Sequence, residues 1–220
     1  MSIFRRRLMM QSKAQPFECP YITDGLVFWL DGINKGKSSA GWQDLISKKV
    51  FPWIARTTQG ENCVIFGVGN TAMNNSSIGS FNSSISTAEA CGSGRSSKNY
   101  QMMLWQAFTN GIILSLDNTN AWLTFKTKGN NGRYAVSIPT TFTLSANSNM
   151  AIVNSTKVTS QRASDWSVGG TGTQIGSRAG TYGYVGNIHC IRVYNRMLTE
   201  EEMLFNHQVD NERFNLGLTL

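Results

Sequence analysis

One run of alternating side chains in this sequence combines the residue types that a sugar-binding surface needs. Trp122, Thr124 and Lys126 fall on one face of a predicted strand, whereas Leu123 and Phe125 fall on the other face. An aromatic ring can stack on a pyranose, and hydroxyl or charged groups beside it can hydrogen-bond to sugar hydroxyls. This polar face is therefore a candidate carbohydrate-binding surface.

The segments on either side of this run extend the same surface. Residues 111–117 and 133–138 also alternate, and they place Asp117 and Arg133 on their polar sides. Short polar turns separate the three strands, so we expect an antiparallel meander that brings these groups beside Trp122. An alternative interpretation is that Trp122 packs under a loop or a third layer.

The composition favours strands for the rest of the chain. Only 15% of residues are charged, against about a quarter in an average protein, and the chain is instead rich in Ser, Thr, Asn and Gly. Further apolar strands are expected at residues 25–31, 63–66, 84–90, 102–108 and 186–194. Trp29, Trp42 and Trp53 are expected in the core. The predicted fold class is an all-β, two-sheet antiparallel jelly-roll sandwich.

One helix is predicted near the end of the chain. Thr199 followed by Glu202 is a capping box, in which each side chain bonds to the backbone of the other residue. Met203 and Val209 supply an apolar stripe, so we expect a short helix over about residues 199–209.

The first 20 residues are predicted to form a basic arm that precedes a sandwich domain over residues 21–220. Residues 1–13 carry four cations and no acid, and the apolar run 8–10 is too short for a secretion signal. The arm could be a solvated tail or could dock on a partner. Bulky apolar groups among the cations favour docking on protein over nucleic acid. The expected docking residues are Phe4, Arg5, Arg6, Arg7, Leu8 and Lys13.

The cysteines and acids indicate little metal chemistry. The four cysteines are widely spaced and no CxxC occurs, so we expect free buried thiols and no zinc site. Asp31, Asn34 and Asp44 are weak candidates for calcium, although Asp31 followed by glycine is also an ordinary turn. No other cofactor is expected.

Three segments carry a resemblance to a known family. Residues 25–32, 42–45 and 186–202 resemble the concanavalin A-like lectin or laminin-G-type jelly rolls found in gut bacterial surface proteins and their phages. The resemblance implies two antiparallel sheets and glycan or protein binding. The basic, Met-rich start resembles the N-termini of phage structural proteins.

Hydrolysis of glycosides is disfavoured by the distribution of acids. Glycosidases of this fold class need two carboxylates facing across a cleft, which on strands would appear as closely spaced acids. The predicted strands carry no such pair, and the family's Glu-x-Asp-x-x-Glu signature is absent. The sequence therefore predicts a protein that is not an enzyme.

Together these features predict a structural protein on the surface of a phage particle, either a capsid decoration or a fibre-associated protein. The arm would bind other virion proteins in an oligomeric assembly formed in the host cytoplasm, and the jelly roll would contact host glycans or neighbouring subunits. No membrane or nucleic-acid partner is expected. The alternative is a carbohydrate-binding module of a bacterial surface protein, located at the cell surface.

Overall fold

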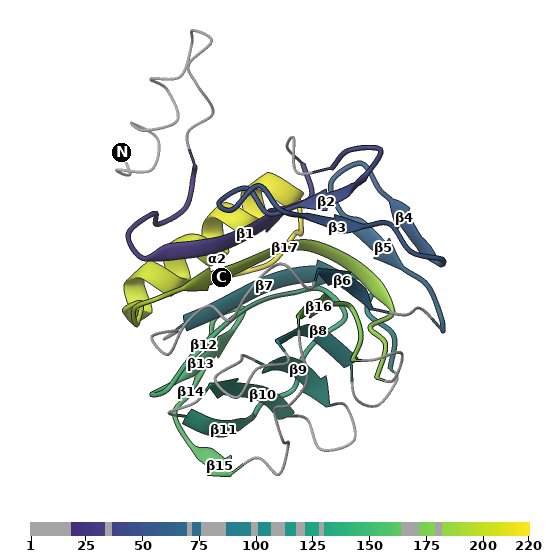
Figure 1. Cartoon of the computed structure of the whole chain (residues 1–220). Coiled ribbons are helices and arrows are strands. Elements are labelled where there is room, and N and C mark those ends of the chain that lie inside the picture. The colour runs from purple at the N-terminus through teal and green to yellow at the C-terminus, as the bar shows by residue number, and fades with distance from the viewer. Residues whose placement is uncertain are drawn as a thin grey trace, which may run out of the picture.

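Two antiparallel sheets stacked face to face make up most of the protein (Figure 1). The structure is a computed structural model that describes residues 19–33, 37–69, 72–75, 87–97, 101–106, 113–117, 122–127, 130–163, 172–178 and 182–220. In these residues the strands form an eight-stranded sheet, a seven-stranded sheet and a separate two-stranded hairpin. The predicted all-β sandwich with one C-terminal helix is confirmed.

The eight-stranded sheet is organised around its longest strand, β17. This strand pairs with β7 along one side, and with both β5 and β1 along the other. The order of the sheet is β14 (Thr156–Val158), β13 (Ala151–Val153), β12 (Phe142–Asn147), β7 (Thr87–Ser93), β17 (Gly186–Tyr194), β5 (Val64–Phe66) and β4 (Thr57–Gln59), with β1 (Leu26–Asp31) also on β17.

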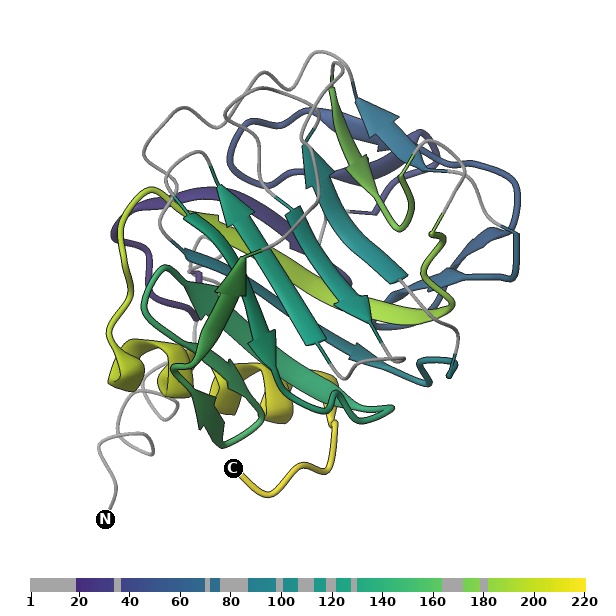
Figure 2. The ribbon, with the colours of Figure 1, turned by 90° about the horizontal axis from the view of Figure 1, so that it is seen from below.

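The seven-stranded sheet contains the predicted meander at its centre. Its order is β15 (Gln161–Ala163), β11 (Asn130–Ala135), β10 (Trp122–Thr127), β9 (Ile113–Asp117), β8 (Gln101–Gln106), β16 (Thr173–Ile175) and β6 (Met73–Asn75). The hairpin consists of β2 (Gly41–Gln43) and β3 (Val50–Pro52). Figure 2 shows the strands of the seven-stranded sheet side by side, with α2 lying beyond them.

Strand β11 differs from its prediction in position. It begins at Asn130, three residues before the expected start, because Thr127 pairs directly with Asn130 and leaves a two-residue connection. A start at residue 133 implies a longer turn, but cross-strand pairing incorporates residues 130–132 into the strand. Strand β7 is likewise displaced, since it spans Thr87–Ser93 and not residues 84–90.

The hydrophobic core fills the space between the two sheets. Leu123 and Phe125 from the seven-stranded sheet and Ile191 and Val193 from β17 are all at most 1% exposed and belong to one cluster. Because side chains alternate along a strand, these contacts place Thr124 of β10 on the opposite face of the seven-stranded sheet. The inward positions predicted for Leu123 and Phe125 agree with this core, whereas Thr124 on the opposite face is also buried, at 3% exposed.

Helix α2 (Glu200–Phe214) covers the other face of the eight-stranded sheet, away from the seven-stranded sheet (Figure 1). The predicted capping box is present: Thr199 Oγ1 accepts from the Glu202 backbone, and the Glu202 carboxylate accepts from the Thr199 N–H. The helix runs five residues past its predicted end and stops at Asn215, which adopts the left-handed conformation. Among the described residues, no helix is long and apolar enough to span a bilayer.

A buried ion cluster lies beneath α2 and includes Asp210, the first residue past the predicted end of the helix. Arg192 on β17 makes two hydrogen bonds of 2.7 Å to the Asp210 carboxylate on the helix, and its Nε lies 2.8 Å from Glu89 Oε2 on β7. All three residues are 0% exposed. A buried cation is tolerated only when its charge and donors are matched, and Asp210 on the helix and Glu89 on β7 supply that match for Arg192.

Neutral polar groups complete the same cluster. Asn206 donates to Glu89, and Ser145 Oγ donates to the other Glu89 oxygen at 2.8 Å. Ser145 Oγ also lies 2.7 Å from His207 Nε2, and His207 Nδ1 lies 2.9 Å from the Asn154 carbonyl oxygen. The helix therefore meets the sheet through hydrogen bonds as well as through apolar contacts.

We expect Asp210→Asn to destabilise the protein by about 3 kcal/mol, because it leaves the buried Arg192 charge partly uncompensated. The matched control is Lys157→Ala, which breaks an ion pair with Glu200 whose side chains are 40% and 37% exposed. That change should cost at most about 1 kcal/mol. Urea unfolding followed by circular dichroism measures both, and equal losses would contradict a stabilising role for the cluster.

His207 makes stability depend on pH in a defined window. Burial lowers its pKa from 6.5 to about 4, so the unfolded chain binds a proton between these values that the folded protein excludes. Stability should therefore fall as the pH drops from 6.5 to 4, by about 3 kcal/mol from this group. His207→Gln should flatten this part of the pH–stability curve, and an unchanged slope in the variant would refute the assignment.

Candidate functional site

The register of β9, β10 and β11 brings the predicted sugar-binding residues together on one face. Trp122 pairs with Asp117 on one side and with Ala135 on the other. One row further along, Thr124 pairs with Arg133, and Lys126 follows on the same face of β10. The register thus sets the backbone positions of these five predicted residues in three successive rows across β9, β10 and β11.

This face becomes more accessible from β9 towards β11. Asp117 and Thr124 are 5% and 3% exposed, whereas Arg133 is partly exposed and Ala135 is exposed. The first residue of β15, Gln161, pairs with Tyr134, so β15 does not cover Ala135. For Trp122 and Lys126 the structure describes the backbone pairing and not the side chains. A ligand on this face would approach from the β11 side, where the neighbour of Trp122 is a small exposed residue.

The two described calcium candidates have structural partners. Asp44 accepts hydrogen bonds from the backbone of Trp29 and Ile46 and from Ser47, and it holds the turn after β2. Asp31 accepts from the Ile33 N–H and from the Arg213 guanidinium. Asn34 lies outside the described residues. Within the part of the chain that the structure describes, no cluster of three His, Cys, Asp or Glu side chains could hold a metal ion.

The predicted docking arm also lies outside the described residues. This applies to every arm residue proposed from the sequence, namely Phe4, Arg5, Arg6, Arg7, Leu8 and Lys13. Its role stays a prediction.

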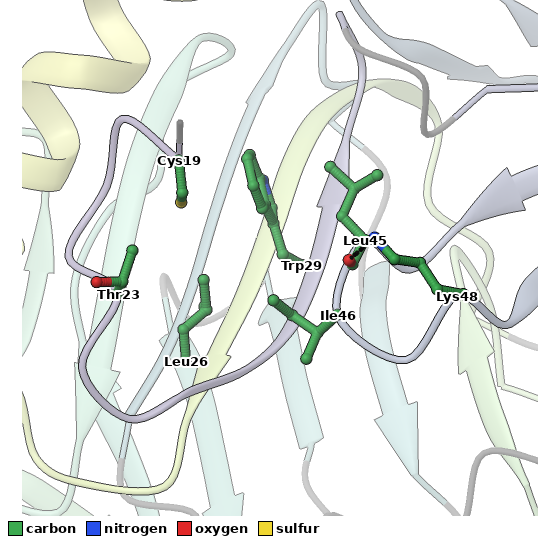
Figure 3. Close-up of a pocket in the computed structure, with 7 residues that line it drawn as sticks. All are labelled: Cys19, Thr23, Leu26, Trp29, Leu45, Ile46 and Lys48. Carbon is green, nitrogen blue, oxygen red and sulfur yellow. Dashed lines mark hydrogen bonds between the residues drawn. The ribbon is translucent and has the colours of Figure 1, made fainter. Parts of the chain in front are cut away.

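A surface groove beside β1 is a second candidate site, which the sequence did not indicate. It has a volume of about 250 Å³ and is lined by Cys19, Thr23, Leu26, Trp29, Leu45, Ile46 and Lys48. Figure 3 shows Trp29 standing between Cys19 and Leu26 on one side and Leu45 and Ile46 on the other. The groove combines residues from β1 and from the turn after β2, which are separated in the sequence.

The chemistry of the groove is mainly apolar. Trp29 is only 3% exposed and packs edge-on against Tyr21, with ring centroids 5.6 Å apart. The expectation that Trp29 belongs to the core is therefore met, although its edge lines the groove. Ile46 is 44% exposed and leaves one wall open to solvent. Such a lining suits an aliphatic group better than a hydroxylated sugar.

The free thiols allow a test of this geometry. All four cysteines are unpaired: Cys63, Cys91 and Cys190 are buried, and Cys19 is partly exposed in the groove. Burial raises the pKa of the Cys19 thiol, which reduces its reactive thiolate form.

We expect N-ethylmaleimide to modify Cys19 before Cys91 or Cys190 in the folded protein, and more slowly than it modifies a free cysteine peptide. Mass spectrometry of digested samples taken over time gives the rate for each thiol. Modification of Cys91 or Cys190 as fast as Cys19 would contradict the described packing.

Comparisons with known proteins show that the fold is similar to that of solved structures. No family model matches the chain, and no curated protein matches it. Among solved structures, Trypanosoma rangeli sialidase is similar, with 16% identity and a TM-score of 0.56 over 94% of this chain and 37% of that chain. The same sialidase with the inhibitor DANA gives a TM-score of 0.55 and 16% identity, and covers 93% of this chain and 36% of that chain. These matches place the protein among related β-sandwiches.

The prediction that the protein is not an enzyme is contradicted by this comparison. It rested on the absence of a carboxylate pair, yet the structures that match over 94% of this chain are sialidases. Sialidases are exceptions to the paired-carboxylate rule because they use a tyrosine nucleophile. The missing pair was therefore the wrong criterion. The chain spans only about 37% of the sialidase chain, so any activity of the whole sialidase remains a proposal for this protein.

Proposed function

We propose that this protein is a carbohydrate-binding β-sandwich, and that the glycan lies on the outer face of the seven-stranded sheet. The observation that carries the proposal is the strand register. It sets the aromatic residue Trp122 between Asp117 and Ala135, one row from Thr124 and Arg133. Residues with a ring, a carboxylate, a hydroxyl and a guanidinium at paired positions of adjacent strands are the types that contact a sugar.

The gradient of exposure supports this placement. The glycan would sit over β10 and β11, where Arg133 and Ala135 reach solvent, and Asp117 and Thr124 would form the floor. A floor that is already packed needs little ordering when a ligand binds, which reduces the entropic cost of binding. One of the fold neighbours, with a TM-score of 0.52, is a sialidase in complex with sialic acid, which is consistent with a sandwich used by carbohydrate-acting proteins.

The finer family assignment is part of the same proposal. The segment that resembles the end of concanavalin A-like or laminin-G-type domains forms β17, a short turn and helix α2 in sequence. A carbohydrate-binding module at a bacterial cell surface agrees with this assignment. The predicted role in a phage particle and the predicted virion partners find no support in the comparisons, and they stay predictions.

A glycan array followed by calorimetry with the best-binding glycan tests the proposal. We expect Trp122→Ala to weaken binding at least about tenfold, equivalent to roughly 1.4 kcal/mol, because a central aromatic contact is lost. The control is Val68→Ala, since Val68 is 73% exposed in the turn after β5, in the other sheet.

Val68→Ala should bind as the wild-type protein does. Absence of binding to every glycan on the array would overturn the proposed function. Wild-type affinity in a correctly folded Trp122→Ala protein would overturn the proposed location of the site.

A further inference from the structure

Two Ser–His pairs lie on the face of the eight-stranded sheet that helix α2 covers. Ser145 and His207 are 2.7 Å apart beneath the helix, and both are 0% exposed. Ser93 Oγ lies 2.8 Å from His189 Nε2 next to Phe214, the last residue of the helix. Ser93 is partly exposed and His189 is 4% exposed, so the second pair reaches solvent through its serine, whereas the first is sealed.

A β-bulge directs His189 towards Ser93. The pairing of β17 with β7 shifts register between Ile188 and Cys190, so His189 is the extra residue. Bulges occur next to active sites because they change the direction of one side chain without interrupting the sheet. Ser93 is the last residue of β7, and its cross-strand partner is Asn187. The bulge therefore brings a histidine to the end of a strand where a serine is partly open.

Hydrogen bonding determines which imidazole nitrogen carries the proton. His189 Nδ1 lies 2.9 Å from the Asn62 carbonyl oxygen, which can only accept. The hydrogen must then be on Nδ1, and Nε2 is left as an acceptor for the Ser93 hydroxyl. A serine whose proton points at an oriented imidazole is the arrangement that nucleophilic catalysis requires.

Two further contacts complete this arrangement. The Asn187 amide donates to Ser93 Oγ at 3.2 Å, which places a hydrogen-bond donor beside the oxygen that would attack. The ring of Phe214 lies 5.1 Å from the His189 ring and closes one side of the pair. Burial also lowers the pKa of His189, which keeps the imidazole neutral near pH 7.

We propose that Ser93 is a nucleophile towards esters of small acyl groups, with His189 as general base and the Asn187 amide as donor to the developing oxyanion. The Ser93 proton moves to His189 Nε2 while Oγ bonds to the acyl carbon. The ester C–O bond then breaks, and the leaving alcohol takes the proton from His189. Water attacks the acyl-serine by the same route, which releases the acid and restores Ser93. This inference does not depend on the glycan site.

A fluorophosphonate probe applied to the folded full chain tests the proposal, because the probe phosphonylates activated serines and releases fluoride. Peptide mapping by mass spectrometry should find the label on Ser93. The label should be absent from Ser145, which is buried. It should also be absent from Ser155, which is exposed and belongs to the turn between β13 and β14. Labelling of Ser155 as fast as Ser93, or no label on Ser93, would overturn the proposal without any variant.

The variants add a test of mechanism. Ser93→Ala should abolish the label, and Ser155→Ala should leave it unchanged. His189→Gln should slow labelling of Ser93 about a hundredfold, because general base catalysis of this kind is lost. Wild-type labelling in a His189→Gln protein with an unchanged circular dichroism spectrum would show that His189 is not the base. Hydrolysis of p-nitrophenyl acetate should be unchanged in Ser155→Ala, slowed about a hundredfold in His189→Gln and abolished in Ser93→Ala.

Discussion

The buried Arg192 guanidinium is the constraint on which the position of helix α2 depends. A cation removed from water costs several kcal/mol unless its charge and donors are satisfied, and Arg192 is satisfied by Glu89 from β7 and Asp210 from the helix. The bidentate pair with Asp210 fixes the rotation of α2 against the sheet. It thereby places Phe214, the last helical residue, against His189. One ion cluster thus joins two neighbouring strands, the helix and the edge of the candidate nucleophile site.

Local patterns predicted the parts of the fold that depend on local physics. Alternation identified β9 and β10, and the Thr199–Glu202 capping box identified the first turn of α2. The end of the helix was missed because residues 210–214 contain three charged side chains and an asparagine, which give no apolar stripe in the sequence. Asp210 is instead buried against Arg192 of the sheet, and the polarity of a residue alone cannot show which partner it has.

The candidate sites differ in how far the sequence could reveal them. The register behind the proposed sugar-binding face could be predicted because the residues lie on consecutive strands joined by short connections. The increase in side-chain exposure from β9 to β11 could not be predicted from the sequence, since it depends on how far β15 extends along β11. The groove at Trp29 joins a strand to a distant turn. The Ser93–His189 pair joins residues 96 positions apart and needs a bulge that no local signal announces.

The central claim is that a glycan binds over β10 and β11. The most direct measurement is the change in backbone amide NMR shifts when the best-binding glycan from an array is added to the isotope-labelled chain. The account predicts that the largest shifts map to Thr124, Arg133 and Ala135 and their strand neighbours. Shifts confined to the groove around Trp29 and Leu45, or no shifts at saturating glycan, would contradict it.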